Sequence, residues 1–291
     1  MINKKKYEII KVLNNNVILA LEPKKRQEMI LVGKGIGFGR KDKTVISLSN
    51  DDLEKSFIAY DEKTKNQYFQ LIDQIDSKVM GISEEIIAEA EEALGKLNSH
   101  IHIVLTDHIG FALDRIKMGM EISNPFIYEI KTLYDEEFRV GIKAAELIRD
   151  SLQIDICEDE IGFIALHLHS ARQNKKITET VKNTRLLKEL IQIIQDELSI
   201  TLDIKDSMYI RLINHLKLVI NRLEEKSYID NPLLGDIKKQ FSESFNIAYK
   251  IGAHISNIKN ITVPDNELGY MTIHIEKLRN EKEKVSKRVT V

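Results

Sequence analysis

The chain has one cysteine, no tryptophan and only four prolines among its 291 residues. A single cysteine excludes an internal disulfide and agrees with a reducing compartment. We expect Cys157 to be a half-buried packing residue and not a nucleophile. No apolar run approaches the roughly 18 residues that a membrane helix needs, and the N-terminus lacks a signal peptide's apolar stretch. We therefore expect a cytoplasmic protein without membrane insertion.

Net charge is also small, at −2, with 43% hydrophobic and 30% charged residues. This composition is ordinary for a folded protein and argues against large-scale disorder. The total hides an asymmetry, because residues 1–60 hold 12 Lys+Arg against 7 Asp+Glu, whereas the remainder holds 31 against 38. The basic end is suited to a polyanion, although the run Lys4 to Lys6 could also be no more than a solvated end.

An internal repeat, with the length of one small domain, is the strongest pattern in the chain. His108 and His167 are separated by the same interval as His215 and His274. The sequence around the first pair recurs around the second at one constant offset without a gap, so the chain carries one domain twice. The other matched positions are Arg115 and Arg222, Asn124-Pro125 and Asn231-Pro232, Ile130-Lys131 and Ile237-Lys238, Phe138 and Phe245, Glu160 and Glu267, and Gly162 and Gly269.

The periodicity of apolar residues predicts a multi-domain protein with one β domain and two α domains. Short β-rich runs at 7–13, 17–21, 29–32 and 44–48 predict strands, and three- and four-residue spacing at 86–97, 138–152 and 185–198 predicts helices. We expect a small all-β N-terminal domain over 1–60, two homologous all-α helical bundles over 65–171 and 172–281, and a charged tail over 282–291. So small a β domain is marginally stable alone, which favours dimeric β sheets.

Two connections in the β domain are unusual. Three asparagines, Asn14 to Asn16, predict a tight hairpin, because asparagine tolerates left-handed backbone. The segment Gly33 to Arg40 has glycine at every second position. A nucleotide-binding loop would need a helix directly after it, and a strand is expected here instead. Cations and one aromatic ring, Phe38, are components of a surface for unpaired RNA bases, unless Phe38 is a core residue.

Several chemistries could explain paired histidines. Zinc is disfavoured, because the two-residue spacing of His167 and His169 points helical side chains apart, and the second repeat lacks the equivalent of His169. Catalysis is disfavoured because no serine, cysteine or carboxylate cluster recurs beside both pairs. Satisfied core histidines remain an alternative. Phosphorylation fits best, since imidazole is nucleophilic and Arg115, two helical turns after His108, could support a dianion, as Arg222 could beside His215.

Several of these motifs together resemble a known family. They are the run Lys11 to Val17, the Gly33-to-Arg40 loop, and the repeats centred on Asp107-His108-Ile109 and Glu160-Ile161-Gly162-Phe163. In this order they resemble the bacterial transcriptional antiterminators of the BglG/SacY class, over residues 1 to about 281. The segment Lys34 to Gly39 is most similar to glucose-type members.

The resemblance implies a dimeric domain that grips an RNA hairpin overlapping a terminator, so that transcription proceeds. It also implies two regulation domains phosphorylated by the sugar phosphotransferase system, with the glucose-type permease and HPr as partners. No enzymatic activity, cofactor, metal or DNA target is implied. The implied RNA contacts are Lys11, Asn16, Gly33, Lys34 and Phe38. The implied phosphoacceptors are His108, His167, His215 and His274.

The chain departs from the family pattern at two positions. Lys34 stands where many relatives have arginine, so the planar, fork-shaped guanidinium group is lost at this position. Asn214 stands in the second repeat where the first repeat has the acidic residue Asp107. The competing interpretation is a DNA-binding activator with similar regulatory domains, which should open with a helix-turn-helix. We hypothesise that phosphorylation of His108 or His167 by the permease inactivates the protein.

Overall fold

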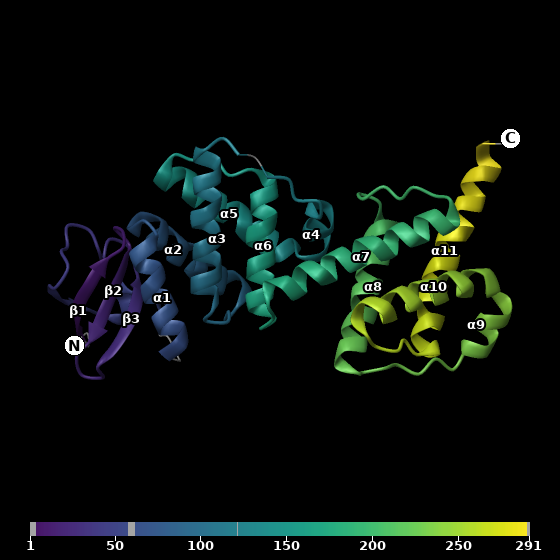
Figure 1. Ribbon diagram of the computed structural model, residues 1–291, viewed down its shortest axis with the longest axis horizontal. Coiled ribbons are helices and arrows are strands. Elements are labelled where there is room, and N and C mark those ends of the chain that lie inside the picture. Colours follow the sequence, from purple (N-terminus) through teal and green to yellow (C-terminus); the bar gives the residue numbers. More distant parts are fainter. Residues whose placement is uncertain (1–3, 58–61, 121, 290–291) are drawn as a thin grey trace. The chain divides into compact units, whose positions relative to one another are not determined.

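The chain divides into two compact units, Met1–Thr180 and Val181–Val291. The computed structural model describes residues 4–57, 62–120 and 122–289 (Figure 1). The first unit combines an antiparallel β sheet with a helical bundle, and the second is helical. The predicted order of a small N-terminal β domain followed by helical domains is therefore confirmed.

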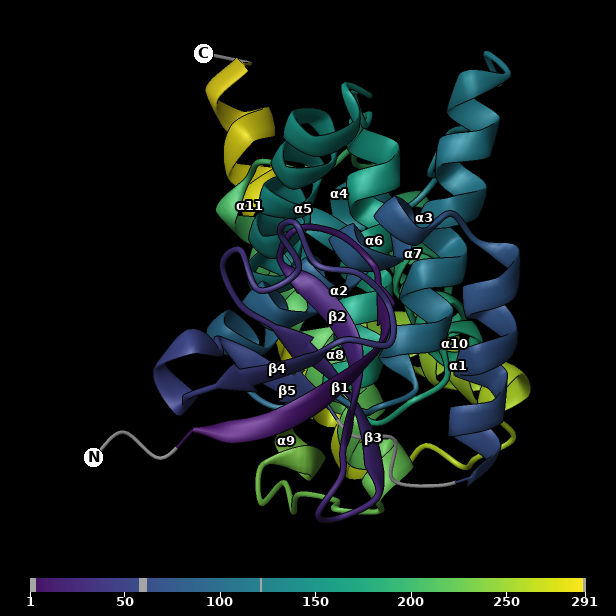
Figure 2. The same ribbon diagram turned by 90° about the vertical axis from the view of Figure 1, so that its left-hand side faces the viewer.

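The sheet has five antiparallel strands in the order β4-β1-β2-β3-β5. Figure 2 looks onto the strands, with α2 (Ser77–Leu94) behind them. Consecutive strands β1, β2 and β3 pair as neighbouring hairpins, with Val17 opposite Val32 at the end of the β2–β3 pair. Four strands lie where the sequence predicts them, and the short β5 adds an edge. The strands are β1 (Lys5–Val12), β2 (Val17–Glu22), β3 (Gln27–Val32), β4 (Val45–Leu48) and β5 (Lys55–Phe57).

Both faces of this sheet are covered. Alternate residues of a strand point to opposite faces, and β2 is apolar on both, so its sequence reads as a nearly continuous apolar run. One face packs within the β domain, through Tyr7, Ile9, Ile18, Ala20, Met29, Leu31, Ile36, Ile46 and Leu48. The other face joins the core of the helical bundle, through Leu13, Val17, Leu19, Ile30, Val32 and Phe57.

The β1–β2 turn lies at the three asparagines, as predicted, but its backbone differs from the prediction. Asn14, Asn15 and Asn16 are all described, and none has a positive φ. Instead, the Asn14 side chain closes the turn, because its Oδ1 accepts hydrogen bonds from the backbone N–H of Asn16 (2.8 Å) and of Val17 (2.9 Å). A side-chain cap thus replaces left-handed backbone.

The glycine-rich segment is a series of turns whose glycines have two different causes. A Cβ on Gly33 would lie 2.2 Å from the carbonyl oxygen of Asp52, and one on Gly37 would lie 2.2 Å from that of Asn14. Gly35 and Gly39 have positive φ values of 71° and 64°. The alternation therefore has a complete conformational explanation: two positions need close backbone approach and two need left-handed backbone.

Helices of the first unit form a bundle behind the sheet. Asp76 caps the second of them by accepting a hydrogen bond from the Lys78 N–H at 2.8 Å. The longest helices bury apolar stripes against one another, as their three- and four-residue spacing predicts. They are α1 (Glu62–Gln74), α2 (Ser77–Leu94), α3 (Ile101–Lys117), α4 (Ile127–Leu133), α5 (Asp135–Leu152) and α6 (Glu158–Arg172).

The helices of the second unit reproduce those of the first at the predicted offset. At the offset that separates the histidine pairs, the bounds of α4 and α5 coincide with those of α9 and α10, and α6 and α11 begin at equivalent residues. The duplication predicted from the sequence is therefore confirmed. The helices are α7 (Ile177–Leu198), α8 (Ser207–Glu225), α9 (Leu234–Gln240), α10 (Ser242–Lys259) and α11 (Asp265–Val289).

Most of the matched residues outside the histidine pairs stabilise the fold. Asn124 accepts a hydrogen bond from the N–H of Phe126 (3.0 Å), and its side chain lies over Gly162, where a Cβ would approach within 2.9 Å. Asn231 and Gly269 repeat this contact in the second unit. Lys131 lies over the ring of Phe138 and Lys238 over that of Phe245. The repeat thus preserves packing as well as chemistry.

Two further findings complete the fold. Among the helices that the structure describes, none is both long and apolar enough to cross a membrane. Cys157 is exposed at the N-cap of α6, so the prediction of a half-buried position is wrong. The residue lies in the loop between α5 and α6, whose burial sequence periodicity does not determine.

Candidate functional sites

The glycine-rich turns present an exposed ring and an exposed cation. Phe38 is 72% exposed, so the alternative that it is a core residue is wrong. Lys34 is also exposed, whereas Gly33 is buried and donates its N–H to the backbone oxygen of Asn16 at 2.9 Å. An exposed phenylalanine beside lysines can stack on a base while the cations neutralise phosphate.

The hairpin and the glycine-rich turns form one continuous surface. Asn16 Oδ1 accepts a hydrogen bond from the N–H of Gly35 at 2.9 Å, and the Gly37 N–H donates to the Asn15 carbonyl at 2.9 Å. The structure thus brings Asn16, Gly33 and Lys34 together, although they belong to two separate connections of the sheet.

Two of the implied RNA contacts are already engaged by helices. Lys11 Nζ donates a hydrogen bond to the backbone oxygen of Ile72 in α1 at 3.2 Å. Asn16 Nδ2 donates to Glu85 Oε2 in α2 at 3.0 Å. Sequence reasoning missed Glu85, because no local pattern indicates that a helical carboxylate 69 residues away meets the hairpin.

The first histidine pair lies between α3 and α6. The rings of His108 and His167 are stacked, with centroids 4.8 Å apart and an interplanar angle of 29°. The two histidines of the first repeat therefore face one another within this bundle. His108 Nε2 and His167 Nδ1 are buried and have no hydrogen-bond partner among the described residues.

A buried carboxylate also lies beside this pair. Glu160 is 2% exposed, its Oε2 is 3.5 Å from His108 Nε2, and its Oε1 forms an ion pair with Arg115. Its equivalent in the second repeat, Glu267, pairs with Arg222, so a single carboxylate, and not a cluster, recurs with each repeat. The sequence does contain a pattern that could have placed this carboxylate near the pair. Glu160 lies seven residues before His167, which puts both on one face of α6.

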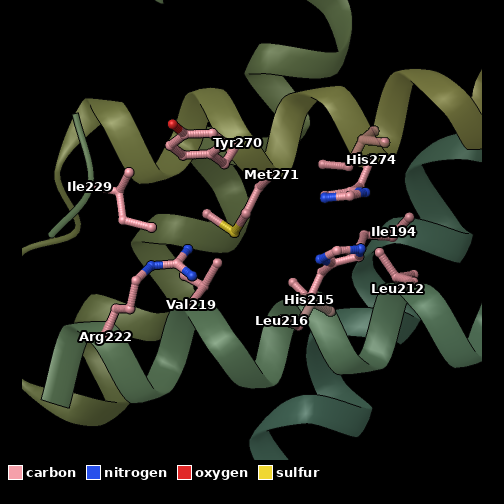
Figure 3. A pocket seen from close by; sticks show the side chains of 11 residues that line it. Ile194, Leu212, His215, Leu216, Val219, Arg222, Ile229, Tyr270, Met271 and His274 are labelled. Atoms are coloured by element: carbon pink, nitrogen blue, oxygen red, sulfur yellow. The ribbon is translucent and has the colours of Figure 1, made fainter. Parts of the chain in front are cut away.

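The second pair lines a cavity of about 190 Å³. The rings of His215, from α8, and His274, from α11, are stacked at 3.7 Å with an interplanar angle of 22° (Figure 3). Arg222 lies in the same cavity wall and donates two hydrogen bonds to Glu267, at 2.9 Å and 2.5 Å. Both arginines thus hold buried carboxylates, and each lies two turns from a histidine, as predicted.

Burial keeps these histidines uncharged. Burial, followed by the charge of Arg115, lowers the pKa of His108 to about 4, and burial lowers the pKa of His167 to about 3. In the second pair, burial lowers the pKa of His274 to about 4 and that of His215 in the same direction. A neutral imidazole has a free lone pair, so all four rings are in the nucleophilic form near neutral pH.

Acid is expected to destabilise the first unit through His108 and His167. Their folded pKa values, about 4 and about 3, lie below the ordinary value, so the unfolded chain binds protons first as the pH falls. Stability present above about pH 6.5 is lost progressively toward pH 3, on the order of 2 kcal/mol per histidine by pH 5. Denaturant unfolding at pH 7.5 and pH 5 should show a smaller loss for His108→Gln/His167→Gln than for the parent; equal losses would contradict a buried neutral pair.

Other histidines have structural partners. His102 Nδ1 is 2.7 Å from Glu84 Oε2 in the core, and His169 Nδ1 is 3.0 Å from Glu137 Oε1. His254 Nε2 is 3.0 Å from Glu189 Oε2. Within the described part of the chain, no group of three or more His, Cys, Asp or Glu side chains could hold a metal ion.

The fold of the N-terminal domain tests the alternative that the protein is a DNA-binding activator. Residues 4–57, which the structure describes, form strands, turns and one short 3-10 helix, Asn50–Asp52. No helix-turn-helix occurs in that range. A DNA-binding activator of the expected kind is therefore contradicted by the fold.

Comparisons with known proteins agree on a single family. The CAT RNA binding domain model matches residues 7–66, and the PRD domain model matches 84–171 and 188–278. The chain is 32% identical to the transcription antiterminator LicT of Bacillus subtilis (strain 168), covering 93% of this chain and 98% of LicT. It is 33% identical to protein GlcT of Staphylococcus aureus (strain bovine RF122 / ET3-1), covering 92% and 95%.

A solved structure, the GlcT CAT-PRDI fragment, is 42% identical and covers 58% of this chain and 99% of the fragment, with a TM-score of 0.49. The family assignment rests on the sequence matches, which span nearly the whole chain. The chain belongs to the family of transcription antiterminators that join a CAT RNA-binding domain to PRD domains.

Proposed function

We propose that this protein binds an RNA hairpin that overlaps a terminator in the leader of a sugar phosphotransferase operon, of the glucose type. The observation that carries the proposal is that Phe38 and Lys34 are both exposed on the same glycine-rich turns of a basic domain. RNA loops and bulges present unpaired bases that stack on aromatic rings, and lysines neutralise the adjoining phosphates. Similarity to GlcT supports the glucose type.

The RNA-binding surface is assigned to Lys11, Asn16, Gly33, Lys34 and Phe38 within residues 1–60. Two copies of this small domain, paired about a two-fold axis, would double the basic surface and bury more apolar area. The regulatory domains are assigned to residues 65–171 and 172–281, with a charged tail after them. The protein acts in the cytoplasm, where nascent RNA is made, and has a regulatory and not an enzymatic role.

The regulatory signal is assigned to phosphorylation of the two histidine pairs. The donors are the phosphotransfer domain of a glucose-type permease, for His108 and His167, and HPr, for His215 and His274. Stacked, neutral imidazoles beside Arg115 and Arg222 support this assignment, since the nitrogens are nucleophilic and a guanidinium can bind a phosphoryl group.

A phosphoryl group acts on the protein chiefly through its negative charge. A phosphoryl group carries about −1.5 to −2 charges, and two like charges about 4 Å apart repel by roughly 4 kcal/mol at an intermediate dielectric. A two-state equilibrium moves from 1:99 to 99:1 with about 5.5 kcal/mol. One or two phosphates beside a buried carboxylate such as Glu160 would therefore shift such an equilibrium far enough to change RNA affinity.

Removing the exposed ring tests the RNA-binding proposal. Phe38→Ala in the full chain should weaken binding to a terminator-overlapping RNA hairpin by about 5- to 150-fold, since stacking contributes about 1–3 kcal/mol per base. Lys34→Gln should reduce the slope of affinity against salt by about one phosphate contact. Both side chains are exposed, so neither change removes core packing and each effect reports on RNA contact.

Val45→Ala is the matched control for that measurement. Val45 is an exposed apolar residue of the same domain, on edge strand β4, and its removal should leave RNA affinity unchanged. Duplex DNA of the same sequence should bind weakly. If RNA and DNA bound equally, with a steep salt dependence and no effect of Phe38→Ala, the surface would be a generic basic patch and the proposal would fail.

A further inference from the structure

A single carboxylate on α2 holds the tip of the β1–β2 hairpin. Glu85 Oε1 accepts a hydrogen bond from Asn14 Nδ2 at 2.6 Å, and Glu85 Oε2 accepts one from Asn16 Nδ2 at 3.0 Å. Both oxygens of the carboxylate are thus used, each by a different asparagine. Charge-assisted hydrogen bonds of this kind are stronger than those between neutral groups.

The surface around Glu85 fits the hairpin closely. Gly81, one turn earlier on α2, lies directly against the Asn14 side chain, and a Cβ there would be 2.4 Å from Asn14 Nδ2. Lys55 forms an ion pair with Glu91 at 3.4 Å further along the same helix. The apolar residues Leu13 and Val17, on either side of the turn, pack into the bundle core. The contact is therefore continuous and not a single surface bond.

Glu85 binds the hairpin through the same kind of atoms that an RNA phosphate would offer. A carboxylate and a phosphate both offer anionic oxygens to amide donors. Glu89, one turn after Glu85 on α2, has its pKa raised by burial and by nearby carboxylates such as Glu85, against the opposing charge of Lys143. This acidic surface repels phosphate while it binds the hairpin. Asn16 is one of the residues assigned to RNA, and its amide is committed to Glu85 in this arrangement.

We propose that the acidic face of α2, centred on Glu85 and Gly81, is an internal binding surface for the RNA-reading hairpin, and that RNA and α2 compete for Asn14 and Asn16. The inference rests on the proposed RNA binding by the β domain. Phe38 and Lys34 stay exposed while the hairpin is held. They are available for a first encounter with RNA, and full binding follows release of the hairpin from α2.

Competition of this kind lowers the apparent affinity for RNA. The observed dissociation constant is the intrinsic constant divided by the released fraction of the protein. Weakening the contact raises that fraction, so a variant without it should bind RNA more tightly than the parent, by about tenfold where one chain in ten is released at rest. Damage to the fold is not expected to produce a gain in RNA affinity.

Two variants with unrelated chemistry test the proposal in the full chain. Glu85→Ala removes the acceptor. Gly81→Ala changes no charge, but its new Cβ displaces Asn14. Glu92→Ala is the control for the first, because it makes the same charge change at an exposed position of α2. Gly235→Ala is the control for the second, because it adds a Cβ to a helix where nothing lies within 4 Å.

The readout is affinity for the RNA hairpin at fixed salt, with circular dichroism to verify folding. Tighter binding by about tenfold in Glu85→Ala and Gly81→Ala, with both controls at the parent value, supports the inference. Parent-like binding in both variants, or an equal gain in Glu92→Ala, overturns it, and the RNA-binding proposal then stands if Phe38→Ala still loses affinity. If neither the parent nor the two variants bind RNA, both proposals fall.

Discussion

Replacing Arg222 with methionine is expected to destabilise the second bundle by about 3–5 kcal/mol, the cost of leaving a buried charge without its partner. Glu267 is fully buried, and its two oxygens accept the two hydrogen bonds that Arg222 donates. Methionine keeps much of the arginine stem's volume, so packing changes little. The loss therefore reports the isolated carboxylate of Glu267.

Hydrogen exchange is the suitable measurement, because it follows each helix separately. Protection in α8 and α11 should fall in Arg222→Met, whereas α3 and α6 of the first unit should be unaffected. Arg211→Met, an exposed arginine on the same helix, is the control and should leave protection within about 0.5 kcal/mol of the parent. The double variant Arg222→Met/Glu267→Leu should regain most of the loss, since it removes both charges. Equal effects of Arg222→Met and Arg211→Met would contradict this account of the ion pair.

The sequence was sufficient to predict the duplication and the histidine pairs. A constant offset between the two repeats requires that α4 and α9, or α5 and α10, have equivalent bounds, and they do. Helical spacing placed Arg115 two turns after His108 and Arg222 two turns after His215. The stacking of His108 on His167 depends on the packing of α3 against α6, which no local pattern indicates.

Contacts between segments that are far apart in the chain could not be predicted from the sequence pattern. Glu160 lies 45 residues from Arg115, and only the packing of α6 against α3 shows that they meet. The docking of the hairpin on α2 is a similar case. Strand β2 is apolar on both faces, which indicates that both are covered. The pattern does not say whether a second copy or a helix of the same chain covers the second face.

The sequence predicted where the turns lie in the chain better than it predicted their backbone conformation. The turn lies at Asn14 to Asn16, but a side-chain hydrogen bond replaced the expected left-handed backbone. Asparagine favours both solutions, so residue type alone does not choose between them. The glycine-rich segment is the converse case, since Gly33 is fixed by close packing against Asp52, a contact that needs the folded sheet.

Loss of both histidines in the first bundle is expected to abolish control by phosphorylation while RNA binding persists. In the parent, a phosphoryl group on His108 would place a dianion beside Glu160, whose Oε2 lies 3.5 Å from His108 Nε2. Glu160 is buried, so the two anions repel at a reduced dielectric. Either Arg115 exchanges Glu160 for the phosphate or the helices separate, and we expect both changes to disfavour the pairing of two β domains that is proposed for RNA binding.

The measurement is RNA affinity before and after phosphorylation by the phosphotransfer domain of a glucose-type permease. The parent should lose affinity on the order of a hundredfold, given roughly 3 kcal/mol or more of repulsion, and His108→Ala/His167→Ala should change less than twofold. His215→Ala/His274→Ala is the matched variant of the other repeat and should retain the loss, because its first pair is intact. Exposed His100 provides a single-site control. If His108→Ala/His167→Ala still lost affinity, control would lie outside this pair, and the role of Glu160 as the repelling charge would fall with it.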